Sequence, residues 1–269
     1  MFQRNKIQPG SGYLNDESKM TGKGMNVMSP YDVSELQEVL RVYNSKGNPV
    51  TVSGMRTGLC GGAVPQGNDV LSTENMHGIV GIGMDDRGFY LRVMPCTTLN
   101  EIDRFLRIGD FSKLEELTEG AIADAKAVEK GLMYPVDPTE LDGSIGGNVA
   151  TNASGPRTYS MGATREWIRG MRVALADGSV FAMHRGLYVA DGRRMSFPSG
   201  RNYFSFDLPE MDNRMDVKNA VGPMIHPGMD LMDLFIGSEG IFGVIVEVDV
   251  YLKERTPTVS LIAFFPDDA

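Results

Sequence analysis

Glycine is the residue type whose distribution first suggests chemistry in this sequence. The chain contains 32 glycines, and the first cluster, residues 54–62, directly follows a β-branched run at 49–53. Successive backbone N–H groups in such a loop can converge on a phosphate, and the missing Cβ atoms allow close approach. The spacing is neither G-x-G-x-x-G nor a Walker A loop, so a plain structural turn explains the cluster equally well.

Two further clusters follow along the chain. Residues 144–155 combine glycines with small residues and asparagines, a composition with many donors and little bulk that suits a flat polar heterocycle. A tight crossing of backbone segments is the structural alternative. Residues 233–244 place a small polar loop between two apolar stretches, which by itself is more often a simple strand–turn–strand.

Side chains suited to acid–base or metal chemistry are few and scattered. The histidines His77, His184 and His226 lie far apart and show no metal-ligand spacing, so we predict no metal site. A lone loop histidine is more often solvated or packed than catalytic. Arg157 and Arg165 lie near the second cluster and could clamp a carboxylate, although structural arginines are commoner there. The catalytic residues are therefore left unassigned.

The elements that must position these loops follow from periodicity. A helix start at 29–32 is followed by apolar residues at helical spacing, and the strand 49–53 completes a βαβ-type unit over 24–53. Further patterns predict strands at 69–72, 89–94 and 241–252, helices from Thr98 and over 113–130, a hairpin at 170–183, an irregular excursion over 185–230 and a strand at 260–265. Parallel-type units followed by hairpins predict a mixed α+β fold.

Composition excludes several classes of function. The net charge of −9 argues against a nucleic-acid surface and against a membrane-surface helix. Two scattered cysteines, Cys60 and Cys96, suggest free thiols in a reducing compartment, so we expect a cytoplasmic protein. Residues 1–16 have no apolar core of a secretory signal, and no apolar run approaches the ~20 residues of a transmembrane helix.

The three clusters together, in this order, resemble the FAD-binding domain of the vanillyl-alcohol-oxidase/PCMH flavoprotein superfamily, and most of all its D-lactate dehydrogenase and glycolate-oxidase flavin-subunit branch. The likeness covers about residues 13–265, with supporting segments at 16–18, 71–76, 134–138 and 176–178. It implies an α+β, two-subdomain PCMH-type FAD-binding fold, with a small βαβ-type N-terminal subdomain and a larger subdomain built on a mixed or antiparallel sheet. The implied boundaries are an N-terminal arm at 1–23, subdomains at 24–80 and 81–255, and the start of a truncated substrate or cap domain at 256–269.

The resemblance also implies which residues bind FAD. The loop that would wrap the pyrophosphate consists of Gly54, Met55, Arg56, Thr57, Gly58, Leu59, Cys60 and Gly61. The residues that would line the flavin and its ribityl chain are Pro138, Ser144, Ile145, Gly146, Gly147, Asn148, Asn152, Gly155 and Gly162. The residues that would meet the adenosine end are Glu239, Gly240, Val244 and Ile245.

This chain departs from the family pattern at several positions. Met55 and Arg56 stand where small residues are usual, so Met55 could crowd the loop, and Arg56 could contact the pyrophosphate or point to solvent. Cys60 replaces a usual serine, and Cys96 a usual glycine. Met161 replaces a commonly aromatic residue, which puts flavin stacking there in doubt. If these departures abolished FAD binding, the main hypothesis would fail.

The activity implied by the resemblance is a D-2-hydroxy-acid dehydrogenase of lactate or glycolate type, with hydride passing from the substrate α-carbon to flavin N5. Electrons would leave to an iron–sulfur, quinone or cytochrome partner. The small 2-hydroxy-acid substrate would bind through a cap domain that we expect to be missing here, with 260–265 as its first strand cut short. The alternative is a standalone FAD-binding or electron-transfer module that needs another chain for its substrate.

Overall fold

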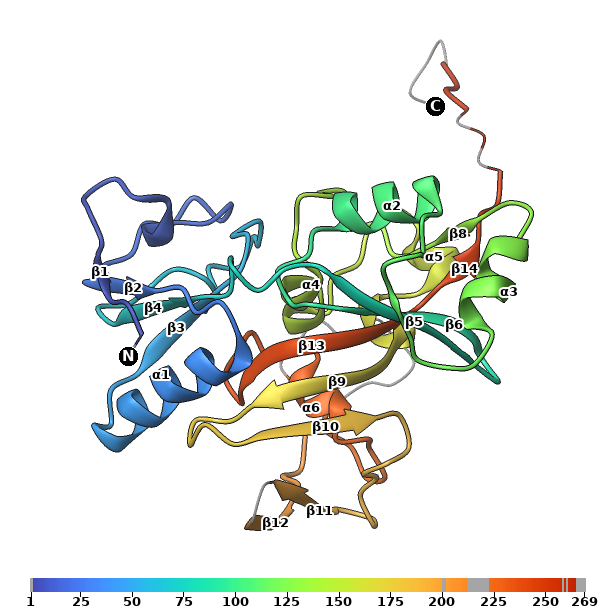
Figure 1. The fold of residues 1–269 in the computed structure, drawn as a ribbon. Coiled ribbons are helices and arrows are strands. Elements are labelled where there is room, and N and C mark those ends of the chain that lie inside the picture. Colours follow the sequence, from blue (N-terminus) through green and yellow to red (C-terminus); the bar gives the residue numbers. More distant parts are fainter. Residues whose placement is uncertain (1, 200–201, 212–222, 258, 260, 265–269) are drawn as a thin grey trace.

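The computed structural model describes residues 2–199, 202–211, 223–257, 259 and 261–264. Two sheets organise the fold, which confirms the predicted α+β class (Figure 1). The strands of the small sheet, in spatial order, are β1 (Asn5–Lys6), β2 (Asn26–Met28), β4 (Asp69–Ser72) and β3 (Val50–Ser53). Strands β2 and β3 both run parallel to β4, whereas β1 is antiparallel to β2.

Helix α1 (Val33–Ser45) connects β2 to β3 and completes the predicted βαβ-type unit. Asp32 caps it, since its side chain accepts a hydrogen bond from the N–H of Glu35. The apolar face of α1 packs with Leu71 of β4 and also with Ala174 and Val246 of the large sheet. This shared core fixes the small sheet against the large one (Figure 1).

The large sheet is antiparallel except at one edge, where β7 runs parallel to β5. Its strands, in spatial order, are β10 (Val180–His184), β9 (Ile168–Ala174), β13 (Val244–Tyr251), β6 (Gly88–Val93), β5 (Ile79–Asp85) and β7 (Glu115–Glu116). The predicted hairpin is confirmed as β9 and β10, with Gly178 at φ 77° in the turn.

Shorter elements surround the large sheet. The helices are α2 (Leu99–Ile108), α3 (Ala121–Ala127), α4 (Ile145–Thr151), α5 (Thr158–Met161) and α6 (Met232–Phe235), with 3₁₀ turns at Gly12–Leu14 and Thr164–Trp167. Two small ribbons are formed by β8 (Leu132–Met133) with β14 (Lys253–Glu254) and by β11 (Arg194–Ser199) with β12 (Asn202–Asp207). The helix predicted from Thr98 is confirmed, with a capping box between Thr98 and Glu101.

Three predicted elements are wrong in part. The helix predicted over 113–130 is formed only at α3, because Glu115 and Glu116 pair with β5 and Gly120 begins the helix in a left-handed conformation. Part of the predicted strand 260–265 lies outside the described residues, and its described part, 261–264, forms no strand. The irregular excursion predicted over 185–230 is wrong where β11 and β12 pair as an antiparallel ribbon, and its residues 200–201 and 212–222 lie outside the described residues. The division of the chain at 23/24, 80/81 and 255/256 stays a prediction.

Candidate functional site

The first glycine cluster forms a loop directly after β3, at the carboxyl end of that strand. None of the backbone N–H groups of residues 55–63 donates a hydrogen bond to any of the described residues. Backbone donors that a protein leaves unpaired are normally met by water or by a ligand. A run of them on a glycine-rich loop is a surface suited to an anion.

The second cluster folds as the short helix α4 with a tight entry. Ser144 caps it by accepting a hydrogen bond from the N–H of Gly147 at 3.3 Å, and the N–H of Ile145 donates to Thr97 O at 2.8 Å. The first turn is therefore satisfied within the protein. Asn148 is buried, and its Nδ2 atom has no hydrogen-bond partner among the described residues. An unpaired buried donor is costly, so a ligand acceptor at this point would stabilise the protein.

The third cluster lies against the end of α4. The N–H of Gly237 donates to Val149 O at 2.9 Å, and the N–H of Glu239 donates to Ala150 O at 2.8 Å. Gly237 and Gly240 both have positive φ, and so does Glu239 at 52°. This left-handed path carries the chain around α4 and into β13.

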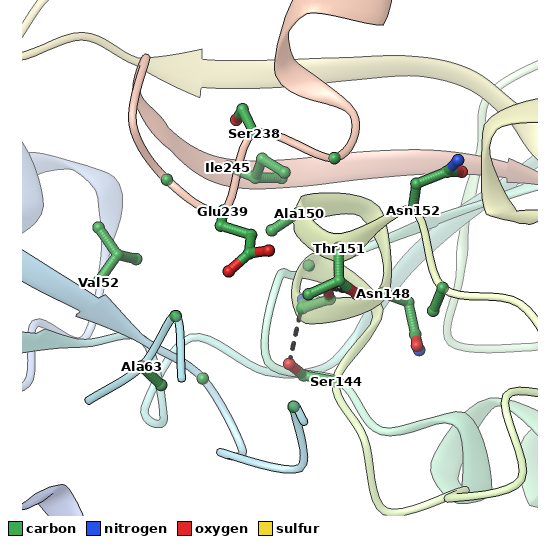
Figure 2. Close-up of a pocket in the computed structure, with 18 of the residues that line it drawn as sticks. Val52, Ala63, Ser144, Asn148, Ala150, Thr151, Asn152, Ser238, Glu239 and Ile245 are labelled. Carbon is green, nitrogen blue, oxygen red and sulfur yellow. Dashed lines mark hydrogen bonds between the residues drawn. The ribbon is translucent and has the colours of Figure 1, made fainter. Parts of the chain in front are cut away.

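These three segments, far apart in sequence, enclose one cavity of about 690 Å³ between the two sheets (Figure 2). Its volume falls within the range of about 300–1,000 Å³ that is usual for ligand and cofactor sites. Figure 2 shows Val52 and Ala63 on one side, Asn148 and Asn152 on the other, and Glu239 between them.

Most of the predicted site residues line this cavity. They are Gly54, Met55, Arg56, Thr57, Gly58, Leu59, Cys60, Pro138, Ser144, Gly146, Gly147, Asn148, Asn152, Glu239, Gly240, Val244 and Ile245. The structure thus gathers all three segments at one place, as the resemblance implied. Their roles toward a cofactor stay predictions.

Four predicted residues do not line the cavity. Ile145 is fully buried in the large core. Gly61 faces the arm, where a Cβ would lie 3.1 Å from Met20 Sδ, and Gly162 ends α5 beside Glu166. Gly155 crosses the backbone of Asp137, which is the tight crossing that composition left open as an alternative.

Other cavity residues were missed from the sequence. Asp16 comes from the arm, Gly62 and Ala63 extend the first loop, and Ile241 and Gly243 extend the third. The glycines of 61–62 were visible as a pair, so Gly62 could have been included. Asp16 belongs to the segment 16–18 that supported the resemblance, but its place at the cavity depends on how the arm folds over the loop, where the N–H of Glu17 donates to Arg56 O.

Arg165 lines the cavity, but its guanidinium is committed elsewhere. It donates to Asp233 Oδ1 at 2.6 Å and to Ile236 O at 2.7 Å, and burial lowers the pKa of this guanidinium. Arg185 shares the same carboxylate at 2.7 Å. Arg165 is therefore a structural residue that fixes the third loop, and Arg157 lies off the cavity with its Nε atom 3.6 Å from Asp137.

The histidines give no site within the described chain. His77, His184 and His226 do not line this cavity, and the described residues contain no group of three side chains suited to hold a metal ion. His184 instead lines a charged depression on the large sheet, together with Arg92, Arg172 and Glu247. Within the part of the chain described, no helix is long and apolar enough to cross a membrane.

The departures from the family pattern have distinct structural consequences. Met55 and Cys60 are exposed on the loop, and both line the cavity. Arg56 donates to Gly54 O at 3.0 Å and stacks 4.9 Å from the centre of the Tyr13 ring, with φ at 60°. Cys96 is buried, and Met161 does not line the cavity, so no flavin stacking by Met161 is expected.

The cavity fits a dinucleotide cofactor such as FAD on three observations. Its loop offers unpaired backbone donors for a pyrophosphate. Asn148 offers an unpaired buried donor for a heterocycle acceptor. Gly146 passes so close to Pro95 that a Cβ would lie 2.8 Å from its carbonyl oxygen, so only glycine allows this path of the wall.

Comparison with known proteins agrees with this fit. The FAD binding domain family matches residues 26–122 and 118–184. D-2-hydroxyglutarate dehydrogenase of Xanthomonas citri pv. viticola is 33% identical over 241 residues, covering 89% of this chain and 39% of the relative. D-lactate dehydrogenase of Anaerostipes hadrus is 29% identical, covering 88% of this chain and 38% of the relative. Glycolate oxidase subunit GlcD of Bacillus subtilis is 28% identical, covering 86% of this chain and 37% of the relative.

The fold is also that of a solved structure, alkyldihydroxyacetonephosphate synthase, with a TM-score of 0.57 at 12% identity over 88% of this chain and 33% of the other. The chain spans about two fifths of the length of the curated relatives it matches. The family match covers more than half of the chain, includes the first two cavity loops, and agrees with the fold and with the cavity's donors. The chain therefore belongs to the family of PCMH-type FAD-binding domains, and FAD is its cofactor.

Proposed function

We propose that this chain is the FAD-holding part of a flavin-dependent dehydrogenase of D-2-hydroxy acids. The observation that carries the proposal is one cavity built from three glycine-bearing segments, where the backbone N–H groups of 55–63 and the side-chain amide of Asn148 have no partner among the described residues. The relatives named as D-2-hydroxyglutarate dehydrogenase, D-lactate dehydrogenase and glycolate oxidase subunit support the substrate class.

In this proposal the protein's residues bind and orient the cofactor. The loop at 54–61 holds the pyrophosphate, the residues around α4 hold the flavin, and the loop at 239–245 meets the adenosine. When bound, FAD would supply the acceptor for a hydride from the substrate α-carbon. The base that takes the hydroxyl proton and the cation that binds the carboxylate are left unassigned, and Arg165 does not serve as that cation because it is already paired with Asp233.

The wider setting is part of the same proposal. Residues 1–23 act as an arm, 24–80 and 81–255 as the two FAD-binding subdomains, and 256–269 as the start of a substrate domain. The reduced cofactor would pass electrons to an iron–sulfur or quinone acceptor in the cytoplasm. The second candidate, an FAD module that works with a separate substrate-binding chain, is favoured by one relative that is itself named as a subunit.

Titration of the purified chain with FAD, followed by its visible absorbance and fluorescence, tests the cofactor. We expect one FAD per chain, and a colourless protein that FAD cannot reconstitute would contradict the proposal.

Anaerobic addition of D-lactate, D-2-hydroxyglutarate or glycolate then tests the reaction. Because the proposal places substrate binding in a further domain, of which 256–269 would be the start, we expect these acids to bleach the flavin of this chain slowly or not at all, and rapid turnover by this chain would contradict that part of the proposal.

A further inference from the structure

Asp16 is a buried carboxylate of the N-terminal arm that lies at the wall of the cavity. Only 8% of the residue is exposed, and its Oδ2 atom has no hydrogen-bond partner among the described residues. Its Oδ1 atom accepts hydrogen bonds from the N–H of Ser18, at 2.9 Å, and from the Ser18 hydroxyl. One oxygen of this carboxylate is therefore satisfied within its own turn, and the other is not.

The arm holds this carboxylate beside the first glycine-bearing loop. The N–H of Glu17 donates to Arg56 O at 3.2 Å, and a Cβ on Gly61 would lie 3.1 Å from Met20 Sδ. The arm thus contacts the loop on both sides of residues 57–60, whose backbone N–H groups donate to none of the described residues. The carboxylate therefore lies next to the part of the cavity wall that offers donors to an anion.

The arginines that line the cavity within the described chain are engaged elsewhere. Arg56 donates to Gly54 O at 3.0 Å, and Arg165 donates to Asp233 Oδ1 at 2.6 Å. Neither guanidinium forms an ion pair with Asp16. A buried charge without a partner is weakly screened, so the charge of this carboxylate acts on any ligand charge that binds nearby.

A carboxylate beside a pyrophosphate site opposes a ligand in proportion to the charge on its phosphates. A phosphate that is esterified on both sides, as both are in FAD, carries a single negative charge, whereas a terminal phosphate carries about two at pH 7. An ionised carboxylate only accepts hydrogen bonds, so it offers a phosphate no attractive contact in return. Selectivity by repulsion of the wrong ligand is a common device in specific binding sites.

We propose that the charge of Asp16 makes the cavity selective for a nucleotide whose pyrophosphate is esterified at both ends, and that it rejects nucleotides that end in a phosphate. The inference rests on the proposed function, since it requires the pyrophosphate of FAD to lie against the loop at 54–61. Asp16 is thus a specificity-determining residue that acts by charge. The segments matched by the FAD binding domain family begin at residue 26, so the arm lies outside them.

The test compares ADP with its β-methyl ester as competitors of FAD, in buffer that contains EDTA so that no divalent cation neutralises the phosphates. The two ligands differ by one negative charge and one methyl group. Wild type is expected to bind the ester about tenfold more tightly than ADP, which is the size of one unit-charge interaction at a partly buried site. In Asp16→Asn this preference should fall to about one. The asparagine Oδ1 atom can still accept from Ser18, so this variant should fold, and circular dichroism checks that it does.

Glu17→Gln is the charge-matched control, because it removes the same charge from the neighbouring residue, whose side chain is more than half exposed and does not line the cavity. It should keep the wild-type preference, whereas Asp16→Ser, a second neutral variant, should lose it. A folded Asp16→Asn chain that still prefers the ester as strongly as wild type would overturn the inference. So would a wild-type chain that binds FAD but binds the two competitors equally, or one from which the ester does not displace FAD. A wild-type chain that binds no FAD would overturn the proposed function as well.

Discussion

The carbonyl oxygen of Asp137 occupies the space that a side chain on Gly155 would need. A Cβ built on Gly155 would lie 1.8 Å from that oxygen and 3.0 Å from Pro138 Cα. Pro138 lines the cavity, whereas Gly155 does not. Gly155 therefore shapes the cavity wall at Pro138 by letting two backbone segments cross.

Gly155→Ala should lower the free energy of unfolding by about 1–3 kcal/mol, because the new Cβ would clash with backbone atoms and one of the two backbone segments would have to move. It should also weaken FAD binding, because relief of the clash displaces Pro138. Urea unfolding and FAD titration measure the two effects. Gly12→Ala is the control, because nothing lies within 4 Å of a Cβ there and its φ is not positive. Wild-type stability in Gly155→Ala would show that the crossing is looser than the structure indicates.

The same residue shows where sequence reasoning stopped. The second cluster could be read as a ligand wall or as a tight crossing, and it is both: Gly146, Gly147 and Asn148 line the cavity, and Gly155 makes the crossing. Composition alone cannot separate these two roles, because both require a residue that has no Cβ atom. The separation depends on Asp137, whose approach is set by tertiary packing.

Local signals succeeded where the responsible contacts are local. The helix start at Thr98 and the hairpin over 170–183 were predicted correctly because the contacts that form them, a capping box and a tight turn, lie within a few residues. The helix predicted over 113–130 failed in its first half because Glu115 and Glu116 pair with β5, which lies more than thirty residues earlier. Such pairing overrides helical periodicity and leaves no local trace.

The buried ion pair between Arg165 and Asp233 leads to a second prediction. Asp233 accepts from both Arg165 and Arg185, and Arg165 also holds Ile236 O beside the third loop. Asp233→Ala leaves a buried guanidinium without its counter-ion, so the free energy of unfolding should fall by about 3–5 kcal/mol. Urea unfolding checks the value, and FAD affinity should fall with it as the third loop loosens.

An exposed pair provides the comparison for that variant. Arg194 and Asp207 are paired at 3.0 Å, with both side chains more than half exposed. Asp207→Ala should therefore change the free energy of unfolding by less than about 1 kcal/mol. Equal losses in the two variants would contradict the claim that burial makes the Arg165–Asp233 pair important.

The buried carboxyl of Asp69 predicts a dependence of stability on pH. Burial alone would raise its pKa, but hydrogen bonds from Tyr43, Asn26 and Arg4 outweigh burial and hold the pKa of Asp69 below its ordinary value. Because the folded pKa lies below the unfolded value of about 3.9, the stabilisation is fully present above that value and is lost as pH falls through the folded pKa. Wild type should therefore lose stability more steeply than Asp69→Asn below about pH 4.

Urea unfolding of both proteins at a series of pH values from neutral to acid measures this difference. At neutral pH the variant should be less stable, because it loses the charged acceptor for Arg4 and Tyr43. The two stability curves should converge toward acid pH. Curves that stay parallel throughout would show that Asp69 does not bind protons differently in the folded and unfolded states.

The two cysteines predict selective protection by the cofactor. Cys60 is exposed on the wall of the cavity, within the run of unpaired N–H groups. Cys96 is buried, and burial raises the pKa of its thiol, which disfavours the reactive thiolate. In the folded, flavin-free chain a maleimide should modify one thiol, and mass spectrometry of the digested protein should locate it at Cys60.

Saturating FAD should slow that modification, because the pyrophosphate and its neighbours would cover the loop. Cys60→Ser should abolish labelling of the folded chain while leaving Cys96 available after unfolding in urea. Labelling of Cys60 at the same rate with and without bound FAD would place the cofactor away from this loop, even if the chain binds FAD tightly.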